Sequence, residues 1–116
     1  MFKLVRDNIP ELIKGSGQTC NFAQIQNPEL MTGFLREKLI EEVNEFLNAD
    51  PSSANGLEEL VDIITVVRAI YSFGGLSTEE FEKIYEKKLE ERGGLSKGFI
   101  MYVSDPIQQG QVSKDE

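Results

Sequence analysis

The segment from Leu57 to Phe73 constrains the fold most, because apolar side chains cover most of its circumference when it is drawn as a helix. Leucine, isoleucine, valine and aromatic residues fall on nearly every side of it, so little surface remains for water. A helix of this kind belongs at the centre of an all-α domain, where other helices cover it.

Start and stop signals predict four helices. Their expected ranges are 7–14, 28–48, 55–73 and 77–92. Asn27, followed by a proline, is a typical N-cap, and Asn55 is expected to cap the third helix. Ser77 and Glu80 form the clearest signal, a capping box, and glycine pairs stop the last two helices.

The segments between and after these helices carry weaker signals. Residues 15–26 are predicted to form a loop with a short extended stretch at 22–25. The sequence GFIMYVS, residues 98–104, fits either a short strand or an arm over a partner chain. We expect one helical domain over residues 1–104, with short extended arms at its ends, and a polar C-terminal tail over residues 105–116.

Composition excludes several classes of function. The chain has no histidine, which excludes Ser/His/Asp and Cys/His nucleophilic catalysis and disfavours zinc. Its formal net charge of -8 has the wrong sign for a nucleic acid polymer or an anionic membrane. Cys20 is the single cysteine, no apolar run reaches bilayer length, and the first residues are too polar for a secretory signal. We expect a cytoplasmic protein.

The acids of the first long helix do not lie on its polar side. At 100° per residue from Leu35, the apolar stripe spans about -40° to +80°, and Glu42 falls within it at about -20°. Glu45 follows at about -80°, while Glu41 lies nearer the rim at about -120°. In the next helix, Glu59 and Asp62 likewise fall among apolar side chains.

Such acids need a partner, because an isolated ionised carboxylate in apolar surroundings costs several kcal/mol. Lys38 is the one basic residue expected on the same side of its helix. Antiparallel packing of the two helices would bring two carboxylate pairs into an all-oxygen cage suited to Mg²⁺, with Mn²⁺ as a substitute. The predicted ligands are Glu42, Glu45, Glu59 and Asp62. The alternative is an ordinary solvated helix face.

Four short segments also resemble a known family. EEVNE at residues 41–45 and ELVD at residues 59–62 are similar to the E-x-x-E and E-x-x-D signature of the MazG-type all-α nucleoside triphosphate pyrophosphohydrolases. KLVRDNIPELI at residues 3–13 and ERGGLSKGFI at residues 91–100 look like the end segments of the phosphoribosyl-ATP pyrophosphohydrolase-like branch. Asn8 and Leu95 differ from that branch, which often has a lysine and an aromatic residue there.

The resemblance implies a helical bundle completed by dimerisation, and we expect a homodimer or homotetramer. It implies Mg²⁺-dependent cleavage of an NTP or dNTP to the monophosphate and pyrophosphate, with the same four acids as ligands. The metal would bridge carboxylates and phosphate oxygens, which is how an acidic protein can bind a triphosphate. Glu41 and Glu42 are both candidates for the general base.

Basic residues are candidates for substrate binding, although each also fits a surface role. They are Lys3, Arg6, Lys38, Lys88, Arg92 and Lys97. Lys38 would either reach a phosphate or balance the acids of its own helix, and Arg6 would otherwise pair with Asp7. Three other functions remain open at this point: phosphoribosyl-ATP pyrophosphohydrolase, a helical module that binds metal or nucleotide without turnover, and an acidic protein-interaction adaptor.

Overall fold

The computed structural model describes residues 2–104 and residue 110. Its helices are α1 (Ile9–Gly15), α2 (Pro28–Leu47), α3 (Ala54–Phe73) and α4 (Thr78–Arg92). Within the described residues no strand forms, so this part of the chain is all-helical, as the sequence predicts. The chain divides into two compact units, Met1–Lys83 and Ile84–Glu116, which are described separately.

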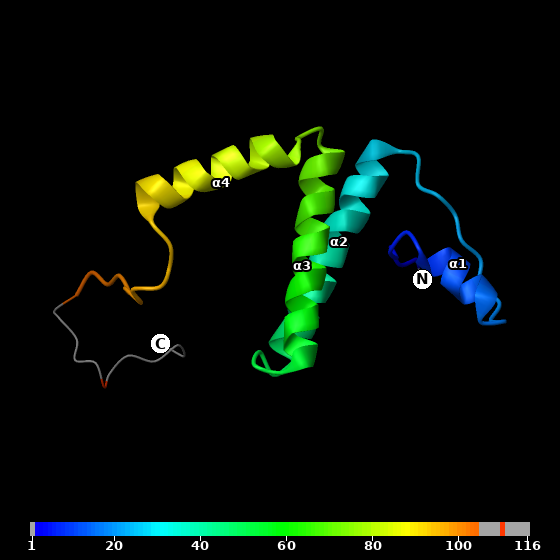
Figure 1. The fold of residues 1–116 in the computed structure, drawn as a ribbon, viewed down its shortest axis with the longest axis horizontal. Coiled ribbons are helices and arrows are strands. Elements are labelled where there is room, and N and C mark those ends of the chain that lie inside the picture. The colour runs from blue at the N-terminus through cyan, green and yellow to red at the C-terminus, as the bar shows by residue number, and fades with distance from the viewer. Residues whose placement is uncertain (1, 105–109, 111–116) are drawn as a thin grey trace. The chain divides into compact units, whose positions relative to one another are not determined.

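The first unit is built on α2 and α3, which lie side by side in Figure 1. A short connection, residues 48–53, joins them, so they run antiparallel. Leu35 of α2 and Val66 of α3 are the most buried apolar side chains described, at 3% and 6% exposed. The core of this unit is therefore the seam between two helices.

A compact turn connects α2 to α3 and fixes the start of α3. The carbonyl of Asp50 accepts hydrogen bonds from the backbone N–H of Ser53 at 3.0 Å and from its hydroxyl at 2.6 Å. Ser53 in turn caps α3, because its Oγ accepts from the N–H of Gly56 at 3.1 Å. Gly56 is buried against this turn, so the connection holds the C-terminal part of α2 beside the first turns of α3.

Two of the predicted caps are confirmed and one is wrong. The side chain of Asn27 accepts from the N–H of Leu30 at 3.0 Å. Ser77 and Glu80 exchange the two bonds of a capping box, at 3.1 and 3.2 Å. Asn55, however, lies inside α3, because Ser53 takes the cap position two residues earlier.

Residues 2–8 form a segment without helix that precedes α1, and we call it the N-terminal segment. Its backbone turns into α1 through a hydrogen bond from the N–H of Ile9 to the carbonyl of Arg6, 3.0 Å long. α1 is shorter than predicted at its start, since Asp7 and Asn8 belong to a turn. The side chains of the N-terminal segment contact α2 and α3, as described below.

The second unit contains the later part of α4 and the residues that follow it. Described side chains from Ile84 onward are exposed. Residues 98–104 form no strand, so of the two alternatives the strand is wrong, and residues 22–25 likewise lack one. The predicted tail, residues 105–116, lies outside the described residues apart from Gly110.

The described helices were also compared with the length and hydropathy of membrane spans. Among residues 2–104 no single helix is both long and apolar enough to cross a membrane, although α3 and α4 taken together as a bent pair pass by length and composition alone.

Candidate metal centre

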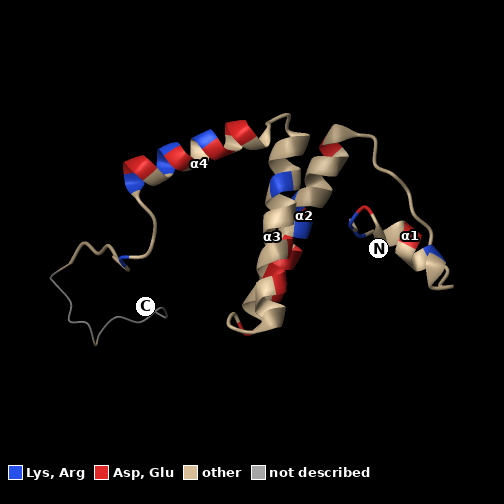
Figure 2. Ribbon diagram, in the orientation of Figure 1, with Lys and Arg blue, Asp and Glu red and all other residues tan. Residues whose placement is uncertain are grey.

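Three glutamates from the two central helices gather at one place. Glu42 and Glu45 of α2 and Glu59 of α3 each offer a carboxylate oxygen, and these oxygens lie within 4.8 Å of one another. We call this group the carboxylate cluster. Figure 2 shows the acidic positions of α2 and α3 on neighbouring stretches of the two helices. Three of the four predicted ligands are therefore brought together.

Burial makes this more than an acidic patch. Glu42 is only 5% exposed, and its Oε2 is buried with no hydrogen-bond partner in the described residues. The Oε2 of Glu59 is in the same situation. A buried, unpartnered carboxylate oxygen is strongly unfavourable unless a cation or a proton compensates it. The cluster could therefore hold a metal ion, and its hard oxygen donors suit a divalent cation.

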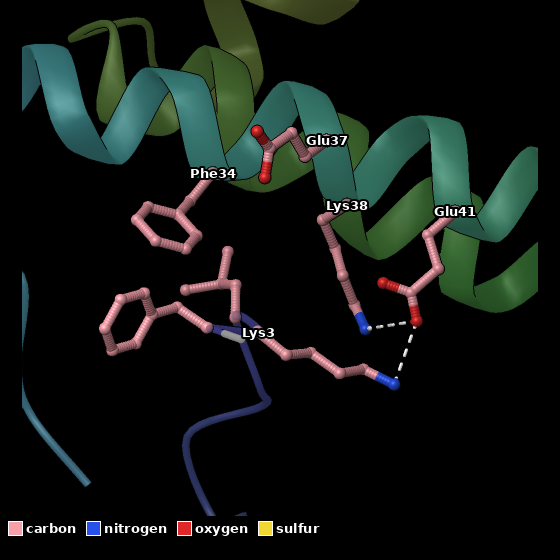
Figure 3. Close-up of a pocket in the computed structure, with 7 residues that line it drawn as sticks. Lys3, Phe34, Glu37, Lys38 and Glu41 are labelled. Carbon is pink, nitrogen blue, oxygen red and sulfur yellow. Dashed lines mark ion pairs between the residues drawn. The ribbon is translucent and has the colours of Figure 1, made fainter.

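Lys38 compensates part of the charge of the cluster, and together with Lys3 it also neutralises the adjacent Glu41. The ammonium of Lys38 lies 3.2 Å from Glu42 and 3.6 Å from Glu41. Lys3 of the N-terminal segment lies 2.9 Å from the same Glu41 oxygen, and Figure 3 shows both lysines converging on it. Glu41 points to these two cations and is not part of the carboxylate cluster.

Asp62, the fourth predicted ligand, has a protein cation instead. Arg6 of the N-terminal segment forms an ion pair with its Oδ1 and also donates to the hydroxyl of Thr65 at 3.1 Å. The predicted alternative for Arg6, a pair with Asp7, does not form. Asp62 is therefore not grouped with the three glutamates, although it lies one turn along α3 from Glu59.

Two acids near this site have shifted pKa values. Burial, and then the neighbouring carboxylate of Glu45, raise the pKa of Glu59 to about 7. The ammonium of Lys3 lowers the pKa of Glu41 by hydrogen bonding to it. Without a metal, Glu59 is consequently about half protonated at pH 7, whereas Glu41 is ionised.

The raised pKa of Glu59 predicts a pH dependence of stability in the metal-free protein. Unfolded, this carboxyl ionises near 4.5, so the folded chain binds the extra proton between about 4.5 and 7. The contribution of Glu59 is most favourable below 4.5 and is lost as the pH rises through 7. Melting temperatures of the wild type and Glu59→Gln, measured in chelator from pH 5 to 8, should therefore move apart. A constant difference would contradict the shift.

Two cavities adjoin the acids. The larger, about 590 Å³, lies between the N-terminal segment, α1, α2 and α3. Its walls are mainly apolar, but Glu42, Asp62 and Arg6 line it as well. The smaller, about 210 Å³, is shown in Figure 3 and is bordered by Phe34, Lys3 and Glu41. Leu4 and Lys38 border both cavities, so they form a common wall.

The remaining predicted residues are not placed at this site. Lys88, Arg92 and Lys97 are exposed residues of the second unit, and their role in substrate binding stays a prediction. Two features of the site were not predicted from the sequence. One is the raised pKa of Glu59, for which the expected proximity of Glu45 is a signal. The other is the contact of Arg6 with Asp62.

No protein-family model, no curated protein and no solved structure matches the chain.

Proposed function

We propose that this protein is a Mg²⁺-dependent nucleoside triphosphate pyrophosphohydrolase that converts an NTP or dNTP to the monophosphate and pyrophosphate. The single observation that carries this proposal is the buried Glu42, whose Oε2 has no partner and whose carboxylate lies beside those of Glu45 and Glu59. Acids gather around a buried carboxylate in this way where they bind a cation or perform chemistry. The resemblance of residues 41–45 and 59–62 to the MazG-type signature supports the same reading.

The residues present fit a divalent cation. Glu42, Glu45 and Glu59 would hold it, and Asp62, one helical turn from Glu59 on α3, would be the fourth ligand. When bound, Mg²⁺ would supply Lewis-acid chemistry, neutralising charge on the phosphate oxygens of the substrate. Oxygen donors alone do not separate Mg²⁺ from Mn²⁺, so both belong in the assay.

The chain's own side chains suggest how the rest of the site is divided. Lys38 borders both cavities, and from there its ammonium would donate to a phosphate oxygen. Glu41 positions the two lysines, and its lowered pKa makes it a weak base near neutral pH. Glu42 would be a metal ligand, so Glu41 and Glu42 both stay candidates for the general base.

We assign the larger cavity to the nucleoside part of the substrate. Its volume of about 590 Å³ lies in the range of small-molecule sites, and its walls combine apolar side chains with a few charged groups. The base and sugar would lie against the apolar side chains, and the phosphates would extend toward Glu42 and Asp62. The preferred base is not fixed by this lining, so the assay needs a panel.

The proposal is tested by measuring pyrophosphate release from canonical and modified nucleoside triphosphates, with Mg²⁺, with Mn²⁺ and with chelator. Metal-dependent formation of monophosphate and pyrophosphate in equal amounts is the expected result. Release of inorganic phosphate instead, or no reaction with any triphosphate, would overturn it.

Three rival functions give different results in the same experiment. A phosphoribosyl-ATP pyrophosphohydrolase would prefer phosphoribosyl-ATP over every simple triphosphate. A non-catalytic module would be stabilised by Mg²⁺ or nucleotide without forming product. A protein-interaction adaptor would show no change in melting temperature with either.

Self-association belongs to the proposal as well. Several large apolar side chains of α2 and α3 are about half exposed or more, among them Ile40, Leu47, Leu57 and Val61. Patches of this kind favour association, and a second copy of the chain would extend a two-helix seam into a bundle. Sedimentation equilibrium should then give a mass of two or four chains, and a mass of 13.1 kDa would exclude it.

A further inference from the structure

We propose that Arg6 is a displaceable counter-ion: it holds Asp62 while no metal is present, and it transfers its guanidinium to the substrate's phosphates when a divalent cation takes Asp62. The phosphate half of this inference rests on the proposed function. The competition between Arg6 and a cation for Asp62 does not, because it can be measured without turnover.

The geometry of Arg6 allows it to pair with Asp62 in one state and to bind phosphate in the other. Both of its hydrogen bonds, to Asp62 and to Thr65, leave from the same nitrogen, Nη2. Within the described residues Nε and Nη1 donate to no side chain, so most of the guanidinium's five donors remain available. The hydrogen bond from Ile9 to the Arg6 carbonyl holds the backbone, so the exchange needs only side-chain rotation.

Exposure makes the ion pair easy to break. The side chains of Arg6 and Asp62 are 52% and 34% exposed, and ion pairs so open to water are weak and screened by salt. A guanidinium binds a phosphate through two parallel charge-assisted bonds, which are stronger. The exchange therefore replaces a weak contact of Arg6 with a better one.

The position of Asp62 explains why a cation would force the exchange. Asp62 follows Glu59 by one helical turn, so its carboxylate is on the same side of α3 as a member of the carboxylate cluster. A divalent cation shared by the cluster and Asp62 would repel a guanidinium on the same carboxylate. Arg6 also lines the larger cavity, so its head can turn toward bound phosphates without leaving the site.

Arg6→Gln tests this with two opposite effects. Binding of Mn²⁺ alone, followed by the electron paramagnetic resonance of the free ion, should become about two- to fivefold tighter, because a weak competitor is gone. The KM for the best triphosphate should rise roughly tenfold, because a charge-assisted phosphate contact is lost. A merely structural role would weaken both. Arg6 is half exposed, so the variant should fold.

Two further variants complete the test. Arg68→Gln is the matched control, because Arg68 is an exposed arginine of α3 that forms no ion pair in the described residues. Its Mn²⁺ affinity and its KM should both stay within about twofold of the wild type. In an Asp62→Asn background, Arg6→Gln should no longer tighten Mn²⁺ binding, because the two residues act on each other.

The outcomes separate this inference from the proposed function. The inference is overturned if Arg6→Gln binds Mn²⁺ no more tightly than Arg68→Gln does. It is also overturned if neither variant binds Mn²⁺. If the wild type hydrolyses no triphosphate but Arg6→Gln still binds Mn²⁺ more tightly, the competition stands and the proposed function fails.

Discussion

Glu42→Gln is expected to lower kcat/KM for triphosphate hydrolysis by at least about 100-fold. Substitution of a residue that only hydrogen-bonds to a metal ligand already lowers metal affinity or activity by about 10- to 100-fold. The substitution keeps the shape of a side chain that is 5% exposed and removes its charge. An amide can still accept from Lys38 but offers a poor donor to a hard cation. Initial rates across Mg²⁺ concentrations measure the loss.

Stability should not fall together with activity, which separates a functional effect from misfolding. Without metal, the amide loses the ion pair with Lys38 but relieves repulsion between Glu42 and the carboxylates of Glu45 and Glu59, so the melting temperature in chelator should not fall. Glu37→Gln is the matched control, because Glu37 is an exposed glutamate of the same helix outside the cluster. Activity of Glu42→Gln within threefold of this control would remove Glu42 from the site.

Gly56→Ala is expected to destabilise the protein by about 1–3 kcal/mol, the range for forcing extra volume into a packed region. A Cβ at this position would lie 2.2 Å from the Asp50 carbonyl oxygen and 2.9 Å from the Cα of Pro51. Both are backbone atoms, so the turn between α2 and α3 must shift. Because that turn holds the acids of the two helices in register, metal binding should weaken together with stability.

Gly33→Ala provides the contrast, since a Cβ there meets nothing within 4 Å. Replacing a glycine inside an unobstructed helix stabilises by about 0.4–1 kcal/mol, chiefly through the unfolded chain. The midpoint of urea denaturation should therefore be lower than that of the wild type for Gly56→Ala and higher for Gly33→Ala. Equal midpoints for the two alanine variants would mean that Gly56 is not packed against the turn as described.

Local signals in the sequence were enough for most of the fold. The caps at Asn27 and Ser77 were predicted correctly because their hydrogen bonds reach only three residues ahead. Asn55 failed for a reason that local spacing does not contain: two cap residues compete there, and the Asp50 carbonyl selects Ser53 by accepting both its N–H and its hydroxyl. That selection depends on how the preceding turn closes.

In the candidate site, too, features within one helix were predicted from the sequence and contacts between distant segments were not. Helical spacing correctly indicated that Glu42 points inward, and the pairing of Lys38 with Glu42 is one of the two alternatives that the spacing left open for this lysine. The pairing of Arg6 with Asp62 joins residues 56 positions apart, and no periodicity within one helix reports it. The position of the N-terminal segment at the site could therefore not be predicted from the sequence.

The proton held by Glu59 has a consequence for calorimetry. A cation that takes this carboxylate must expel the proton, which passes to the buffer, so the heat of binding will include the buffer's own enthalpy of ionisation. Titrations in PIPES and in Tris, two weakly metal-binding buffers with different enthalpies of ionisation, would then differ at neutral pH, and the difference would vanish in alkaline solution, where the carboxyl is already ionised.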